Sequence, residues 1–252
     1  MKGKLYLVPN TLDFGVEGAA VDLQEVLPLH AIRIASRLTH WAAENAKTTR
    51  AFLKRVDAIQ PLALPLQEIQ ITELPRPAKG RNEAVPSRDW GRLLTPALDG
   101  QDLGLISEAG LPAIADPGAL LVAAAHAANV EVESLSGPSS LLMALACSGL
   151  NGQSFAFVGY IPAEPQARTA RIRELESLSL KLGQTQLMIE TPYRNAALLQ
   201  ALLATLKPGT LLSVSCGLSL PGGFTRSATV AEWRAHKKEL PDKVPAVFAL
   251  LA

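Results

Sequence analysis

The sequence predicts an α/β protein in which parallel strands are buried between layers of helices. Residues 103–106 (LGLI) form a continuous apolar run, which is typical of a strand covered on both faces. A small-residue loop and a helix that opens near Asp116 follow. Residues 130–135 alternate like a second strand, and the small-residue loop 136–140 and an apolar helix over 141–147 come next. Two successive strand–loop–helix units indicate an open sheet with a crevice at its loops.

Length and composition indicate which class of α/β protein this is. The 252 residues are enough for one large or two modest domains, and 48% of them are hydrophobic, as in ordinary soluble α/β proteins. No apolar run approaches the roughly 20 residues of a membrane span, and the run 5–8 is too short for a signal peptide. Cys147 and Cys216 have no CxxC spacing, and the four histidines form no HExxH pattern. We therefore expect reduced cysteines, a cytoplasmic location, no membrane association and no metal.

The elements before the linker can be taken in order. The pattern predicts strands at 4–9 and 31–35 and helices at 21–27, 41–57 and 86–98, with the strand at 103–106 in the centre. Residues 59–85 are proline-rich and stay unassigned. The basic residues there and just beyond (Arg76, Lys79, Arg81, Arg88 and Arg92) could contact phosphate, but a solvated loop explains them better.

The residues Asn151-Gly152-Gln153 resemble a linker, which places one domain at 1–150 and a second at 151–252. The second domain is predicted to contain strands at 155–160, 185–190, 225–230 and 244–251. A charged helix is expected over 163–180, and Trp233 is expected to start a surface helix.

Two loops carry the candidate chemistry. In the stretch that begins with residues 107–112 (SEAGLP), Gly110 and the two alanines would let a ligand approach the main chain closely. Asp116 could contact that ligand, but it also suits the N-cap of the next helix with Pro117 at the first helical position, which we favour. Ser139 or Ser140 could likewise cap the helix that follows them. No Walker loop or GxGxxG pattern occurs.

Five blocks of sequence resemble a known family. Residues 107–118 (SEAGLPAIADPG) are similar to SDAGTPxISDPG, and residues 136–150 (SGPSSLLMALACSGL) to PGPSAxxxALxxSGL. Further matches are 5–9 (LYLVP), 155–162 (FAFVGYIP) and 189–194 (IETPYR). In this order and spacing they resemble the tetrapyrrole methylase-like (class III) S-adenosylmethionine-dependent methyltransferases. Within that family they most resemble the branch that contains the ribosomal RNA small subunit methyltransferase I.

The resemblance implies two α/β/α domains with S-adenosylmethionine bound in a cleft between them and S-adenosylhomocysteine as the product. It also implies a homodimer. The cofactor would be held largely by main-chain groups, which explains why the matching motifs consist of small residues. The cofactor-binding candidates are Pro9, Ser107, Glu108, Ala109, Gly110, Pro112, Ser139, Ser140, Thr191 and Pro192. Tyr193 and Arg194 are candidates for shaping the cleft.

Several positions depart from the RNA-modifying relatives. Their first loop has a Pro-Ile-Gly-Asn turn, where this chain has NTLDFG at 10–15. Their AEDTR-like segment corresponds to AENAKTTR at 43–50, so Glu44, Lys47 and Arg50 are the surviving catalytic candidates for activating a hydroxyl or stabilising an oxyanion. A helix surface with a Glu44–Lys47 pair is the simpler alternative. Of an HEHNE-like motif only Asn82-Glu83 is present, and SCGLSLPGGF at 215–224 replaces an REL-type segment.

Three functions fit these observations. Similarity along most of the chain favours a methyltransferase for the ribose 2′-O of ribosomal RNA, acting on RNA or a 30S particle. A net charge of +1 and the altered positions leave open a methyltransferase for a small tetrapyrrole-like molecule. A non-catalytic protein that binds S-adenosylmethionine is the third possibility.

Overall fold

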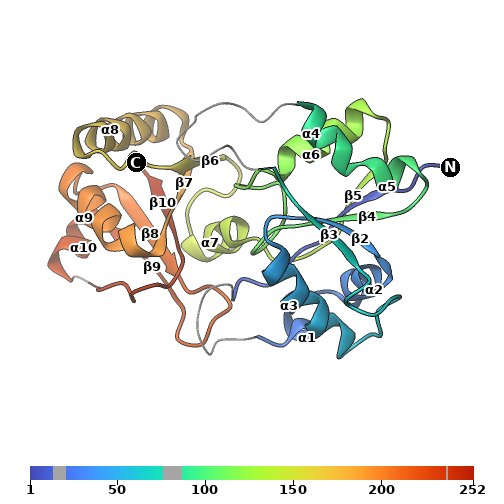
Figure 1. Cartoon of the computed structure of the whole chain (residues 1–252). Coiled ribbons are helices and arrows are strands. Elements are labelled where there is room, and N and C mark those ends of the chain that lie inside the picture. Colours follow the sequence, from blue (N-terminus) through green and yellow to red (C-terminus); the bar gives the residue numbers. More distant parts are fainter. Residues whose placement is uncertain (14–20, 76–86, 237) are drawn as a thin grey trace. The chain divides into compact units, whose positions relative to one another are not determined.

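A computed structural model describes residues 1–13, 21–75, 87–236 and 238–252, drawn in Figure 1. These residues fall into two compact units, one up to Pro138 and one from Ser139 onward. Each unit contains one five-stranded sheet with helices on both faces. The predicted fold class is therefore confirmed.

The first sheet is entirely parallel and has the strand order β3-β2-β4-β1-β5. Its strands are β1 (Leu5–Leu7), β2 (His40–Ala43), β3 (Gln70–Glu73), β4 (Leu103–Ile106) and β5 (Val132–Ser134). The predicted strand at 103–106 is confirmed, and all four of its residues are buried, as its apolar run required.

Alternate side chains of this sheet enter two separate cores. Trp41 of β2 lies in a cluster with α1 (Leu23–Val26), α2 (Leu29–Arg37) and α3 (Ala46–Asp57), whereas Ala42 faces the opposite cluster. The latter cluster is covered by α4 (Ser87–Leu93), α5 (Thr95–Leu98) and α6 (Gly118–Ala127). Gly104 permits this packing, because a Cβ there would lie 2.7 Å from the Trp41 ring.

The second sheet is mixed and has the order β6-β7-β10-β8-β9. Its strands are β6 (Phe155–Tyr160), β7 (Thr185–Glu190), β8 (Leu211–Cys216), β9 (Phe224–Thr229) and β10 (Ala246–Leu251). Only β6 and β7 pair in parallel, and β10 lies antiparallel to both of its neighbours. One face is covered by α8 (Pro165–Leu182), α9 (Asn195–Thr205) and α10 (Val230–Ala235), the other by α7 (Ser140–Ser148).

The division between the units lies at 138/139, whereas the turn residues 151–153 predicted it after Leu150. The reason is the packing of α7, whose Leu141, Ala144 and Leu145 join Leu187 and Val247 of the second sheet. The helix that follows the GPSS residues thus belongs to the second core.

Three expectations about elements were wrong. Residues 31–35 lie in α2, because four apolar residues in five can fill a helix face as well as a strand. Trp41 lies in β2, and the helix expected from 41 begins only at Ala46, where Asn45 caps it. Trp233 does not start a surface helix: it is fully buried within α10, which a capping box at Thr229 opens.

Other expectations lie outside the described residues. They concern part of the basic stretch (Arg76, Lys79 and Arg81), Asn82-Glu83, and the end of the first loop from Phe14 to Gly18. Among the described helices, none combines the length and apolar character that crossing a bilayer requires.

Candidate functional site

The carboxyl ends of β1, β2 and β4 meet at one edge of the first sheet, because the strands are parallel neighbours. Three loops leave this edge: the first loop (residues 9–13), the residues 44–45 before α3, and the SEAGLP loop (residues 107–112). In an open parallel sheet this edge is where ligands bind.

The backbone of the SEAGLP loop and the residues after it adopts an unusual conformation. Gly110 has φ of 70°, and Ala113 and Ala115 also have positive φ values of 67° and 66°. A left-handed conformation costs an alanine about 1–2 kcal/mol. Ser107 is buried, and its hydroxyl donates to the Ala109 carbonyl at 3.1 Å. This loop therefore depends on contacts with its surroundings to keep its shape.

Asn10 supplies many of those contacts. It forms an antiparallel bridge with Gly110, in which the Asn10 amide donates to the Gly110 carbonyl at 2.9 Å and the Gly110 amide donates back at 3.2 Å. The Asn10 side-chain Nδ2 also donates to the carbonyls of Ser107 at 3.2 Å and Glu108 at 3.1 Å. Pro9 lies so close to Gly137 that a Cβ on Gly137 would lie 2.2 Å from the proline ring.

The structure brings Glu44 to the SEAGLP loop. The Glu44 carboxylate accepts from the Glu108 amide at 3.0 Å, and Asn45 Nδ2 donates to the Glu108 carboxylate, also at 3.0 Å. Asn45 simultaneously caps α3 by accepting from the Lys47 and Thr48 amides. The residue that replaces the second acidic position of the relatives thus has a structural role in this chain.

Lys47 and Arg50 are placed differently from Glu44. Both are exposed on α3, and the guanidinium of Arg50 donates to the Ala46 carbonyl of its own helix at 3.5 Å. Of the three predicted catalytic residues, only Glu44 has a described contact with the SEAGLP loop.

Asp116 acts on the start of α6, although the helix begins two residues later, at Gly118. Its Oδ1 accepts from the amides of Gly118 at 2.7 Å and Ala113 at 3.0 Å. Its Oδ2 is buried and has no hydrogen-bond partner among the described residues. Burial raises the pKa of Asp116, against the effect of these backbone bonds.

The other cofactor candidates lie in the second unit. Ser139 occupies the N-cap position of α7, but its hydroxyl does not cap the helix, and Ser140 is the first helical residue. Thr191 and Pro192 form a turn around Glu190, whose Oε1 accepts from the Thr191 amide at 2.7 Å and from Arg194 Nη2 at 2.6 Å. Arg194 therefore stabilises this turn, while Tyr193 is 85% exposed.

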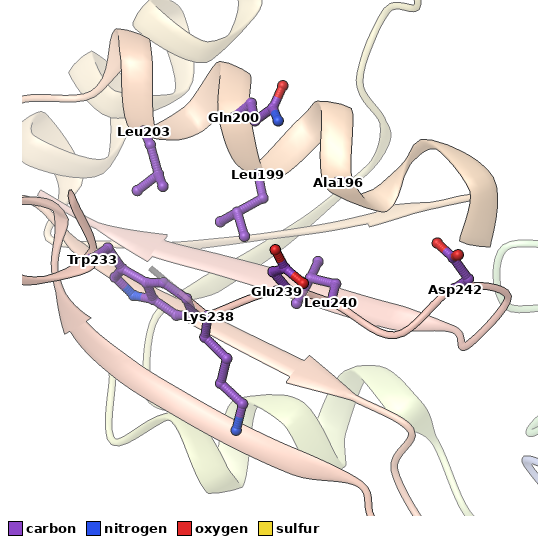
Figure 2. A pocket seen from close by; sticks show the side chains of 9 residues that line it. All are labelled: Ala196, Leu199, Gln200, Leu203, Trp233, Lys238, Glu239, Leu240 and Asp242. Atoms are coloured by element: carbon purple, nitrogen blue, oxygen red, sulfur yellow. The ribbon is translucent and has the colours of Figure 1, made fainter. Parts of the chain in front are cut away.

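A pocket of about 390 Å³ lies elsewhere in the second unit, between α9 and the segment after α10 (Figure 2). Leu199 and Leu203 line it from α9 and Leu240 from the facing segment, and Glu239 and Asp242 bring carboxylates to it. The predicted site residues do not line this pocket.

Sequence reasoning missed the contacts that Asn10 makes with the SEAGLP loop and the contacts that Arg55 makes with Thr11 and Asp13 of the first loop. Asn10 lies shortly after β1, separated from it by Val8 and Pro9, and a short amide side chain after a buried strand is a signal for a loop contact. Arg55 gave no signal, since one arginine on an amphipathic helix is indistinguishable from a solvated residue.

Comparison with known proteins identifies the family. Residues 24–232 match the family model described as Tetrapyrrole (Corrin/Porphyrin) Methylases, which is most of the chain. The fold agrees, because the uroporphyrin-III-C-methyltransferase structure from Thermus thermophilus aligns with a TM-score of 0.53 and 20% identity, covering 100% of this chain and 93% of that one. The chain belongs to the tetrapyrrole methylase family.

Within that family, similar sequences carry the name Ribosomal RNA small subunit methyltransferase I. The one from Xylella fastidiosa (strain Temecula1) is 48% identical over 84 residues, covering 33% of this chain and 31% of the relative. The one from Micromonospora olivasterospora is 32% identical over 204 residues, covering 81% of this chain and 56% of the relative. The chain thus spans less than two thirds of these relatives.

Proposed function

We propose that this protein is an S-adenosylmethionine-dependent methyltransferase that acts on ribosomal RNA of the small subunit, at a ribose 2′-oxygen. The single observation that carries the proposal is the SEAGLP loop, which continues from β4 at the ligand-binding edge of the sheet and is held there by Asn10 and Glu44. Relatives with similar sequence are named for that substrate.

The residues present fit a cofactor held mainly by the main chain. Gly110 is buried, and a Cβ added there would lie 3.3 Å from Leu12 and 3.5 Å from the Pro138 carbonyl. Ser107, Glu108, Ala109, Pro112 and Pro9 of the first unit are the proposed contacts, together with Ser139, Ser140, Thr191 and Pro192 of the second. Bound S-adenosylmethionine would supply a methyl group on a sulfonium, which needs neither a metal nor a covalent enzyme intermediate.

The chain's own residues would then have to align the acceptor oxygen with that methyl group and accept its proton. We propose Glu44 for the proton, because its carboxylate lies beside the SEAGLP loop. Lys47 and Arg50 are proposed to contact the acceptor from the exposed face of α3. A Glu44→Gln variant should bind the cofactor with unchanged affinity and lose most of its methyl transfer.

Calorimetric titration with S-adenosylmethionine and S-adenosylhomocysteine tests the cofactor site. We expect micromolar binding by the wild type and its loss in Gly110→Arg, whose side chain would have to displace Leu12 and the Pro138 carbonyl beside the loop. Gly110→Ala is the matched control, since it adds only the left-handed strain and a Cβ. A wild type that neither releases heat nor gains thermal stability with either ligand would contradict the proposal.

The acceptor is tested by offering radiolabelled S-adenosylmethionine with 30S particles that lack ribose methylation. Transfer of label to the RNA supports the proposal, and weakening of the RNA complex by salt would accompany it. Transfer only to a tetrapyrrole would favour the small-molecule alternative, which the family description and the net charge of +1 support. Cofactor binding without any transfer would indicate a non-catalytic protein.

We also propose that the protein is a cytoplasmic homodimer, by resemblance to the family. Light scattering of the purified chain measures its mass directly, and a value near the 26.8 kDa of one chain would contradict the dimer.

A further inference from the structure

We propose that Arg55 is a positioning residue, which fixes the SEAGLP loop by holding the first loop against α3. The part of this inference that concerns the cofactor rests on the proposed function, whereas the part that concerns the loop does not. Arg55 lies on α3, and it acts on the SEAGLP loop through two sets of contacts.

The first set joins α3 to the first loop. Arg55 Nη2 donates to Asp13 Oδ2 at 3.1 Å and to the Val21 carbonyl, while its Nη1 donates to the Thr11 hydroxyl at 3.4 Å. The Thr11 hydroxyl in turn donates to Asp13 Oδ1, and the Val21 amide donates to Asp13 Oδ2 at 2.9 Å. One guanidinium therefore bonds directly to three residues. One of these, Asp13, has a side chain that is only 8% exposed.

The second set joins the first loop to the SEAGLP loop. Thr11 and Asn10 are 1% and 6% exposed, and the Thr11 amide donates to Asn10 Oδ1 at 2.9 Å. This bond orients the Asn10 amide group so that its Nδ2 faces the carbonyls of Ser107 and Glu108. The bridge between Asn10 and Gly110 completes the connection.

The SEAGLP loop continues into a strained segment of backbone. Gly110 in the loop has a positive φ value, and Ala113 and Ala115 just after the loop hold positive φ values that an alanine leaves when nothing opposes the change. Asn10 bonds to the loop at three residues, Ser107, Glu108 and Gly110. A change that frees Asn10 therefore removes all of these contacts together. Loss of Arg55 should therefore change a loop that it does not touch.

An arginine is required for this role. Its fork reaches a hydroxyl, a carboxylate and a carbonyl together, whereas the single ammonium of a lysine can keep the ion pair but not the full set of bonds. The expected order of effect is therefore wild type, then Arg55→Lys, then Arg55→Met.

The test is amide hydrogen exchange and S-adenosylhomocysteine titration on the full chain. In Arg55→Met we expect the amides of Asn10 and Gly110 to exchange about tenfold faster without any ligand, while those of Val8 and Leu105 stay protected. We expect affinity for S-adenosylhomocysteine to fall by about tenfold, and Arg55→Lys to restore part of both effects.

Two control variants on α3 separate positioning from general stability. Val56→Ala removes a fully buried side chain beside Arg55 and should lower the melting temperature while the Asn10 and Gly110 amides and the affinity stay unchanged. Lys54→Met removes an exposed charge and should change none of these.

Equal exchange of the Asn10 and Gly110 amides in Arg55→Met and wild type overturns the positioning role. The same holds if Val56→Ala reproduces both effects at a matched melting temperature. Failure of the wild type to bind S-adenosylhomocysteine would instead contradict the proposed function, and the exchange result would still decide the role of Arg55.

Discussion

Asp13 and Asp116 lie in the same unit, and their surroundings shift their pKa values in opposite directions. Burial alone would raise the pKa of Asp13, but bonds from Thr11, the Val21 amide and Arg55 together lower it below the usual 3.8. Burial dominates at Asp116 and raises its pKa above 3.8. The two carboxylates should therefore contribute to stability in opposite pH ranges.

At Asp13 the stabilisation is complete above about pH 3.8 and is lost as the pH falls through the lower pKa of the folded protein. An Asp13→Asn variant should be less stable than wild type at neutral pH. The difference should shrink as the solution is made more acidic, which urea unfolding at a series of pH values measures. A difference that does not depend on pH would show that Asp13 acts only as a neutral hydrogen-bond acceptor.

At Asp116 the sign is reversed, because the folded protein holds the proton more tightly than the unfolded chain. Stability of the wild type should decrease as the pH rises from about 3.8 through the raised pKa of Asp116. An Asp116→Asn variant lacks this decrease, so its melting temperature relative to wild type should increase over the same range. Parallel pH curves for the two proteins would contradict the expectation.

Among the elements, α8 is connected to the turn before β8 by one buried carboxylate. Glu176 is 6% exposed, and its Oε1 accepts from the Lys207 amide at 2.7 Å and the Thr210 hydroxyl at 2.5 Å. Glu176→Ala leaves both donors unpaired, which should lower the free energy of unfolding by about 2–4 kcal/mol.

Glu174→Ala on the same helix is the matched control for this variant. Its carboxylate is exposed and pairs with Arg171, so its loss should cost well under about 1 kcal/mol in denaturant unfolding. Similar losses in the two variants would show that the buried bonds of Glu176 contribute no more than a surface ion pair.

The sequence correctly predicted those helices and strands whose apolar residues recur with a clear period or whose ends are marked by turn or capping residues. Strands 155–160 and 185–190 and the helix after Gly118 were found because their apolar pattern and boundaries agree. The sequence predicted a strand at residues 31–35, since four apolar residues in five fit either element and only the packing of α2 against α3 decides. β3, an edge strand of the first sheet, carries mostly exposed residues and so lacks a strand signal.

For the candidate site, sequence indicated which loops are involved but not what holds them. The small residues of SEAGLP predicted a close approach of the backbone, and Gly110 has the expected left-handed conformation. The side-chain contacts that Asn45 and Asn10 make with this loop span 63 to 98 positions of the chain, and no local pattern indicates contacts at such separations. Sequence likewise did not indicate that Glu44, which precedes α3, contacts this loop while Lys47 and Arg50 are exposed on the helix.

At the scale of the whole molecule, the proposed cofactor residues come from both units. If one molecule of S-adenosylhomocysteine contacts Gly110 and Thr191, it should slow amide exchange at the SEAGLP loop and at the turn around Glu190 together. At 100 times its dissociation constant it should add about 2.7 kcal/mol to the stability of the liganded region. Protection confined to one unit would contradict the assignment of the other unit's residues.

The order of strands in the two sheets has a consequence for synthesis on the ribosome. β1 pairs with β4 and β5, so after its synthesis β1 waits through nearly a hundred residues for its neighbours. In the second sheet β10 joins β7 to β8, so two separate strand pairs await residues 246–251. Each nascent sheet has unpaired strand edges until its central strand, β4 or β10, has been synthesised and has paired with its neighbours. During this interval the chain most needs protection from aggregation.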